Sequence, residues 1–279
     1  MLASRLKSHF KHSRDQIVGS VKIGSQKYKI RGYLPSRLAT PTEYEPHVAF
    51  TISKILQKRK GVFIDVGANV GQTLFTLLRV DPHCSYLGFE PQVACCHYLQ
   101  QFIEDNLLMP RIRIFPVALS SKTGFLPFFS NNAQDNMGSL LPELWQPKNE
   151  QFVCARKGDE ALTELGASTI SAIKIDVEGA EISVLTGLQK TLEIMRPPVI
   201  FEVLPNFIGH DLIMLEESTC ARRRAAADDI YQLLSSVGYT IFQIDEKSRT
   251  LFSIKQFNLD DRDSFHGLDY VAVESADYF

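Results

Sequence analysis

The chain has 279 residues, of which 44% are hydrophobic and 22% charged, which is ordinary globular composition. It argues against a coiled coil, a collagen-like chain and a disordered tail protein. The 30 basic and 32 acidic residues give a net charge of −2, so we expect no general attraction to nucleic acid. No apolar run approaches the roughly 18 residues that a membrane span needs.

The cysteines indicate neither a disulfide framework nor a zinc site, because their number is odd and none shows C-x-x-C spacing. They are Cys84, Cys95, Cys96, Cys154 and Cys220. Reduced thiols are typical of the cytoplasm, so we expect a cytoplasmic protein. We predict no bound metal.

The first 59 residues are predicted to form a cap in front of the main domain, which we place at residues 60–279. The cap begins with a basic stretch, residues 1–14, whose apolar residues recur every fourth position. A helix there would be amphipathic, as in a transit peptide or a membrane-surface helix, and the alternative is a frayed, solvated end. A possible hairpin at residues 18–32 and a helix near residues 46–58 follow.

From residue 60 onward, short apolar runs alternate with helical stretches, which is typical of parallel strands joined by crossover helices. No helix separates the last two strands, so they should be antiparallel neighbours. The predicted fold class is therefore a doubly wound, Rossmann-like α/β sheet of seven mostly parallel strands with an antiparallel last strand. The predicted strands are residues 61–66, 85–90, 111–118, 170–177, 198–203, 238–244 and 268–274.

One segment, residues 124–154, interrupts this alternation. It contains two strand-like runs, residues 125–129 and 151–155, around a polar stretch. We predict an inserted hairpin at the functional edge of the sheet.

A glycine-bearing turn, Asp65-Val-Gly-Ala-Asn-Val-Gly71, links the first strand of the main domain to its helix. Glycines let the backbone turn tightly and approach a ligand, and the amides at the helix N-terminus face the crevice. In the dinucleotide fingerprint the third glycine lies five positions after the first, whereas here Gly71 lies four after Gly67 and Asn69 replaces the second glycine. This spacing resembles class I S-adenosylmethionine-dependent methyltransferases. The resemblance implies that four residues of this turn contact the cofactor, with Asp65 near its aminoacyl end. They are Asp65, Gly67, Asn69 and Gly71.

Glu90 ends the next strand, 23 residues after Gly67. An acid at that place can accept both hydroxyl hydrogens of a ribose. The alternative is an exposed glutamate without a ligand. Together with the turn, Glu90 indicates an adenosine-bearing cofactor.

The octet Lys174-Ile-Asp-Val-Glu-Gly-Ala-Glu181 resembles the fourth-strand motif of FkbM-type methyltransferases. Four further stretches match the family's landmarks in order, at residues 66–71, 89–91, 117–120 and 198–203. This resemblance, over about residues 60–205, implies S-adenosylmethionine as the cofactor, with Ala118 among its contacts, and methylation of a hydroxyl. The stretches 156–162 and 208–227 fit the family loosely or not at all, and both lie where an acceptor would bind.

Asp176 is predicted to end the central strand, where open α/β sheets bind their ligands. Lys174 shares a strand face with it and could hold it ionised. Three roles remain open for Asp176: general base toward the acceptor hydroxyl, electrostatic partner of the sulfonium, or ligand of a divalent cation. A purely structural acid is the fourth possibility.

Two further residues are candidates for catalysis. Glu202 closes the fifth strand, and His210 follows in the adjoining loop, with an imidazole that titrates near neutrality. A magnesium site made of Asp176, Glu178 and Glu202 is conceivable, but the sequence does not require one.

The sequence therefore predicts a methyltransferase that uses S-adenosylmethionine to methylate a hydroxyl of a sugar, a glycan or a secondary metabolite. An N-methyltransferase is a near variant. A nicotinamide-dependent oxidoreductase and a non-catalytic cofactor-binding module are the alternatives. The acceptor would be a small molecule or a glycan, and the sequence leaves the oligomeric state open.

Overall fold

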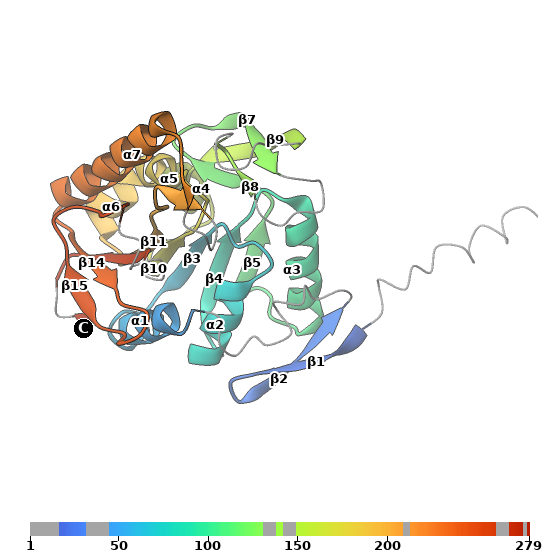
Figure 1. Cartoon of the computed structure of the whole chain (residues 1–279). Coiled ribbons are helices and arrows are strands. Elements are labelled where there is room, and N and C mark those ends of the chain that lie inside the picture. The colour runs from blue at the N-terminus through green and yellow to red at the C-terminus, as the bar shows by residue number, and fades with distance from the viewer. Residues whose placement is uncertain are drawn as a thin grey trace, which may run out of the picture.

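A central sheet dominates the computed structural model, which describes residues 17–31, 45–130, 138–141, 149–208, 213–260, 268–275 and 278–279. Its order is β15-β14-β16-β11-β10-β3-β4-β5 (Figure 1). In chain order these strands are β3 (Val62–Val66), β4 (Ser85–Phe89), β5 (Ile112–Phe115), β10 (Ile170–Ile175), β11 (Val199–Glu202), β14 (Thr240–Ile244), β15 (Leu251–Ser253) and β16 (Asp269–Val273).

The order of the strands reverses between β3 and β10. The chain proceeds outward from β3 through β4 to β5, and then returns to place β10 on the other side of β3. The pairings of β3 with β4, of β3 with β10 and of β10 with β11 are all parallel. Ligands of open α/β sheets bind at the carboxyl ends of the strands beside such a reversal. The functional site is therefore expected after β3 and β10.

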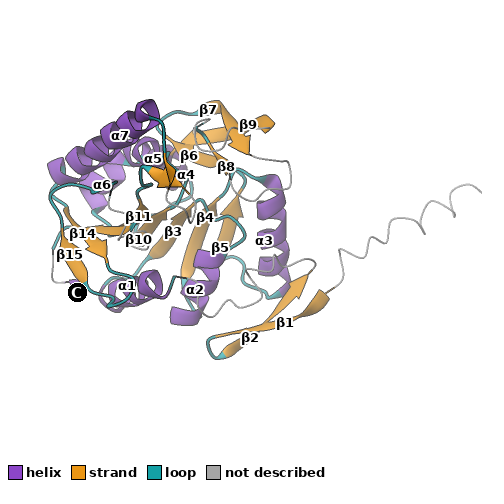
Figure 2. Ribbon diagram, in the orientation of Figure 1, coloured by secondary structure: helices purple, strands orange, loops and turns teal. Residues whose placement is uncertain are grey.

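Helices cover both faces of the sheet (Figure 2). One apolar cluster joins Phe63 of β3 to α1, α2 and α3, while the next residue, Ile64, belongs to the cluster under α4 to α7. This alternation places successive side chains on opposite faces. No helix in the described ranges is long and apolar enough to cross a membrane. The helices are α1 (Pro46–Lys58), α2 (Gln72–Val80), α3 (Val93–Asp105), α4 (Gly158–Glu164), α5 (Glu181–Gly187), α6 (Gln189–Met195) and α7 (Glu217–Ser236).

The sheet confirms the predicted fold class and differs from it in two details. The predicted antiparallel pairing of the last two strands is confirmed, and β16 lies between β11 and β14. An eighth strand, β15, was missed because it has three residues, two of them exposed. The predicted strand 111–118 stops at Phe115 because Pro116 has no N–H to donate.

Ala118 instead begins a second, four-stranded sheet with the order β6-β9-β7-β8. The antiparallel pair β7 and β9 confirms the predicted hairpin. The hydroxyl of Ser139 in β8 donates to the carbonyl oxygen of Glu178 at 2.7 Å, so this small sheet contacts the loop that follows β10. Its strands are β6 (Ala118–Ser120), β7 (Gly124–Ser130), β8 (Gly138–Ser139) and β9 (Asn149–Lys157).

The predicted hairpin and helix before residue 60 are both present. Strands β1 (Ile17–Ile23) and β2 (Gln26–Arg31) form the hairpin, and Arg31 Nη2 of β2 donates to Asp105 Oδ1 of α3 at 2.6 Å. Helix α1 has the predicted bounds. The basic stretch 1–14 lies outside the described residues. A last small pair, β12 (Phe207–Ile208) and β13 (Ile213–Met214), precedes α7.

Candidate functional site

The glycine turn after β3 is packed directly against the end of β10. The amide of Asp176 donates to the carbonyl oxygen of Val66 at 2.9 Å. Gly67 has φ 88°, and a Cβ added there would lie 1.8 Å from the carbonyl oxygen of Asp176. Only glycine allows this approach, because any other residue would put a carbon inside the neighbouring backbone. The turn and Asp176 therefore occupy one edge of the sheet, on either side of the reversal.

Glu90 is fixed beneath the turn by two backbone amides. Asn69, whose φ is 47°, donates its N–H to Oε2 at 2.9 Å, and Gln92 donates to Oε1 at 2.8 Å. Glu90 is only 5% exposed, so the alternative of an exposed strand-end glutamate is wrong. Burial raises the pKa of this carboxyl to about 7, although the two amide bonds act to lower it. The other end of the turn is Gly71, which precedes α2.

Asp65 lies below the turn and is fully buried. Its Oδ2 accepts the hydroxyl hydrogen of Tyr86 at 2.6 Å, whereas its Oδ1 has no hydrogen-bond partner in the structure. Burial raises the pKa of Asp65 to about 6, against the opposing charge of Lys174. An unsatisfied buried carboxylate oxygen is costly, so this atom marks a place for a donor.

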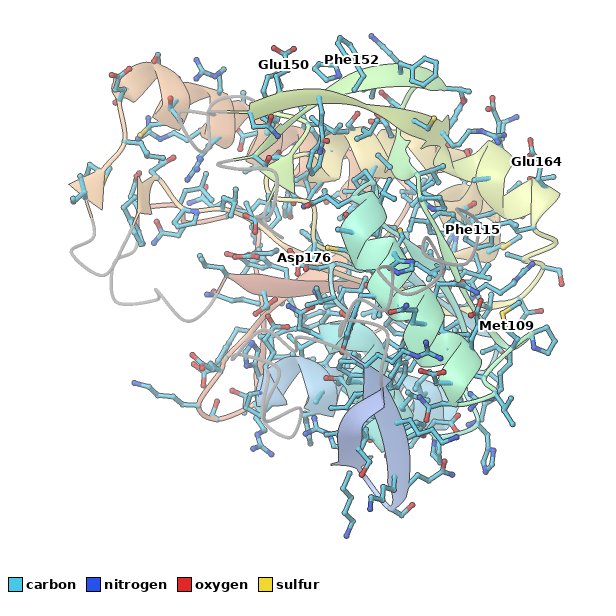
Figure 3. The ribbon with its side chains drawn as sticks, turned by 90° about the vertical axis from the view of Figure 1, so that its right-hand side faces the viewer. Met109, Phe115, Glu150, Phe152, Glu164 and Asp176 are labelled. Carbon is cyan, nitrogen blue, oxygen red and sulfur yellow. The ribbon has the colours of Figure 1, made fainter. Side chains whose placement is uncertain are left out.

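Lys174 and Asp176 form the predicted ion pair, with Nζ and Oδ2 2.7 Å apart (Figure 3 labels Asp176). The lysine side chain is 6% exposed and the aspartate side chain 29%. Burial acts to lower the pKa of Lys174, but the negative charges of Asp176, Glu45 and Asp65 outweigh it and raise that pKa well above its ordinary value. The lysine is therefore a fixed cation that leaves part of Asp176 accessible.

Further carboxyl groups surround this pair. Glu202 faces Asp269 across the β11–β16 ladder. Burial, with the charges of Asp176 and Asp269, raises the pKa of Glu202 well above its ordinary value. Burial also raises the pKa of Glu178 and of Glu181 to about 7 in each case. Such shifts favour the protonated acids, which can donate a hydrogen bond.

Two residues at the start of α1, Glu45 and His47, reach the same edge, and neither is predicted from the sequence. His47 is 4% exposed, and its Nε2 lies 2.7 Å from Oδ2 of Asp269. Burial lowers the pKa of His47, but Asp269 and Glu45 outweigh this and raise it. Burial raises the pKa of Glu45 to about 7. The predicted helix at 46–58 was the available signal, since helices that pack antiparallel to the strands begin at the carboxyl edge.

Two predicted site residues remain, Ala118 and His210. Ala118 is buried in β6, three residues after the end of β5. His210 lies outside the described residues. Within the described part of the chain, no group of three or more histidine, cysteine, aspartate or glutamate side chains is arranged to hold a metal ion.

We expect the free energy of unfolding to fall as the pH rises from about 4.5 to about 7. The buried carboxyls of Glu90 and Glu181 and the half-buried carboxyl of Glu178 have their pKa raised from 4.5 to about 7, so the folded protein binds more protons than the unfolded chain across that range. Stability is then greatest below the unfolded pKa and is lost as the pH passes the folded one. Urea unfolding at a series of pH values measures this dependence.

The variant Glu178→Gln is the control for this pH dependence, because it removes one of the titrating carboxyls. Its free energy of unfolding should fall less steeply with pH than that of the unchanged protein. A stability that is constant or rises between pH 4.5 and 7 would contradict the expectation.

Comparison with known proteins identifies the family. The methyltransferase FkbM domain model matches residues 65–241. The 2-O-methyltransferase NoeI of Sinorhizobium fredii is 29% identical over 155 residues, which are 50% of this chain and 63% of that protein. The methyltransferase sdnD of Sordaria araneosa is 29% identical over 168 residues, 49% of this chain and 64% of that protein. The match thus spans less than two thirds of either relative.

Solved structures resemble the chain more distantly. A methyltransferase FkbM from Methylobacillus flagellatus KT is 18% identical with a TM-score of 0.39, over 52% of this chain and 33% of that one. A precorrin-6y C5,15-methyltransferase from Geobacter metallireducens is 10% identical with a TM-score of 0.42, over 84% and 90% of the two chains. The domain model, by contrast, covers more than half of this chain and includes the glycine turn, Glu90 and Asp176. The protein therefore belongs to the FkbM methyltransferase family.

Proposed function

We propose that this protein transfers a methyl group from S-adenosylmethionine to a hydroxyl of a sugar, a glycan or a secondary metabolite. The observation that carries the proposal is the placement of Glu90. Its buried carboxyl is held by the amide of Asn69 in the glycine turn, while the ion pair of Lys174 and Asp176 lies across the sheet reversal. A candidate ribose-binding acid and a candidate reactive carboxylate thus stand at the same carboxyl edge of the sheet, where open α/β sheets bind their ligands.

The residues around the turn fit this cofactor. Each Glu90 oxygen accepts one amide, and a carboxylate oxygen has a second lone pair with which to accept a ribose hydroxyl. Oδ1 of Asp65 has no partner and would accept a donor from the aminoacyl end. We assign Gly67, Gly71 and Ala118 to the walls of this site. S-adenosylmethionine supplies a methyl group bonded to a positively charged sulfur.

The chain's own part in the chemistry is to hold the acceptor and remove its proton. Asp176 is a partly exposed carboxylate of the site, and Lys174 supplies it with a fixed charged donor. We assign to Asp176 the acceptance of the hydroxyl proton. Glu202, whose raised pKa favours the protonated form, would donate a hydrogen bond to the acceptor, and His210 remains a candidate base.

Oxygen is the favoured acceptor atom because NoeI is named a 2-O-methyltransferase. A nicotinamide-dependent oxidoreductase is not favoured, since both curated relatives are methyltransferases and the glycine spacing departs from the dinucleotide fingerprint. A non-catalytic module would have no evident use for the ion pair at Asp176.

We further propose a cytoplasmic protein that acts on small molecules or glycans. All five cysteines are free, four of them buried, as expected in a reducing compartment. Residues 60–279 would form the methyltransferase domain, and residues 1–59 a cap that contributes Glu45 and His47 to the edge of the site.

The variant Glu90→Gln tests the proposed cofactor site. We expect its affinity for S-adenosylhomocysteine to fall about tenfold to a hundredfold, because a charged hydrogen bond is worth about 1.5–3 kcal/mol. Isothermal titration calorimetry of both proteins measures the difference. Glu104→Gln, an exposed glutamate of α3, is the matched control and should bind as the unchanged protein does. Folded, cofactor-free protein that binds NAD and not S-adenosylhomocysteine would refute the proposed function.

A further inference from the structure

A pocket opens beside the loop that follows Asp176. Gly179 and Glu181, at the start of α5, form one side of it, and Val203 and Leu204, just after β11, form its floor. The first half of α7 forms the opposite side. These residues follow β10 and β11, so the pocket lies on the carboxyl side of the sheet, and Gly179 is three residues after Asp176 in the chain.

The inner part of this pocket is apolar. Ala226 and Ile230 follow Arg222 at intervals of four residues along one face of α7, and all three line the pocket. Ile230 is 2% exposed and Val203 is 5% exposed, so the inner end lies in the core. The helix rises about 12 Å between Arg222 and Ile230. The cavity volume of about 70 Å³ has room for a few methylene groups, so the rest of a longer hydrocarbon chain would lie in the open mouth of the pocket.

The outer part of the pocket carries positive charge. Arg222 is exposed, and its Nη2 donates to the hydroxyl of Thr219 at 3.0 Å. Arg223 donates to the carbonyl oxygen of Pro205, and its charge acts to lower the pKa of Glu178. The nearby carboxyl of Glu181 accepts the amide of Gly179 at 3.0 Å and so points toward its own backbone. A ligand in this pocket thus meets two guanidinium groups outside and hydrocarbon inside.

We propose that this pocket binds the methyl acceptor, and that the acceptor is an amphipathic acid with a hydrocarbon portion and a carboxylate or phosphate. The apolar portion lies against Val203, Ala226 and Ile230, and the anionic group lies at Arg222 and Arg223. The hydroxyl to be methylated is carried near the anionic group and then lies on the side of the pocket formed by Gly179 and Glu181, in the loop that follows Asp176. This inference rests on the proposed function and narrows its substrate class.

Calorimetric titration of the full chain with decanoate tests the inference. We expect one decanoate per chain, and weaker binding of decanol, which has the same hydrocarbon chain without the charge. Ala226→Trp fills the pocket and should weaken decanoate binding at least about tenfold, since it displaces buried methylene groups. Ala225→Trp, at the exposed neighbouring position of α7, is the matched control and should leave binding unchanged. Arg222→Gln should weaken decanoate binding about threefold, because Arg222 is exposed, and should leave decanol binding unchanged.

Parallel titrations with S-adenosylhomocysteine separate this inference from the proposed function. Protein that binds S-adenosylhomocysteine but not decanoate, or that binds decanoate equally well after Ala226→Trp, would overturn the inference alone. Equal binding of decanoate and decanol, unchanged by Arg222→Gln, would overturn its anionic part. Folded protein that does not bind S-adenosylhomocysteine would overturn the proposed function itself.

Discussion

Replacing Gly67 with alanine is expected to lower the free energy of unfolding by about 2–5 kcal/mol. Two effects add. A non-glycine residue at φ 88° is strained, at a cost of about 1–2 kcal/mol. The added Cβ would also lie 1.8 Å from the carbonyl oxygen of Asp176, which is backbone and cannot turn aside as a flexible side chain could. The turn and the end of β10 must then separate, so affinity for S-adenosylhomocysteine should fall as well.

Gly166→Ala separates the two effects. Gly166 also has a positive φ, of 70°, but an added Cβ there would meet nothing within 4 Å. The free energy of unfolding of the Gly166→Ala variant should therefore fall only by the cost of the strained backbone, about 1–2 kcal/mol. Its affinity for S-adenosylhomocysteine should be unchanged. Urea unfolding and calorimetry on both variants measure these quantities. Equal losses of stability in the two variants would show that the close approach to Asp176 contributes nothing.

The sheet could be predicted from the sequence because its strands are buried on both faces. Every residue of β10 is buried, and four of its six residues are apolar, with only Ser171 and Lys174 polar, so this largely apolar run can be recognised without tertiary information. The edge strand β15 has no such run, because an edge strand contributes little to the core. The position of β16 between β11 and β14 depends on long-range pairing, which hydrophobic periodicity does not report.

The candidate site was predictable where its residues follow strands directly. The turn after β3, Glu90 after β4 and Asp176 after β10 each stand at a fixed offset from a recognisable strand. Glu45 and His47 stand at the start of helix α1 instead, and His47 contacts Asp269, 222 residues away. Nothing local in the sequence marks such a contact. The apolar pocket along α7 lies in a stretch where the resemblance to the family fails, so it required the structure.

Replacing Asp176 with asparagine is expected to reduce methyl transfer by about 10²–10⁴-fold, the usual contribution of a general base. The change keeps the shape of the side chain and removes its charge, so Lys174 Nζ retains an oxygen within reach. Transfer of a labelled methyl group from S-adenosylmethionine to a pool of hydroxylated metabolites measures the loss. Asp228→Asn, at an exposed position of α7, is the control and should transfer at the unchanged rate. A variant at Asp176 that is equally active would remove this residue from the mechanism.

Affinities for the charged and the uncharged cofactor distinguish the two main roles of Asp176. A carboxylate that attracts the sulfonium stabilises S-adenosylmethionine more than S-adenosylhomocysteine, whose sulfur is neutral. In that case Asp176→Asn would weaken the binding of S-adenosylmethionine and leave the binding of S-adenosylhomocysteine unchanged. A general base acts on the acceptor, so its removal should lower transfer far more than it changes the ratio of the two affinities. Asp176→Asn also leaves the positive charge of Lys174 uncompensated, which disfavours the sulfonium, so we expect the ratio to shift toward S-adenosylhomocysteine by less than about tenfold while transfer falls by about 10²–10⁴-fold.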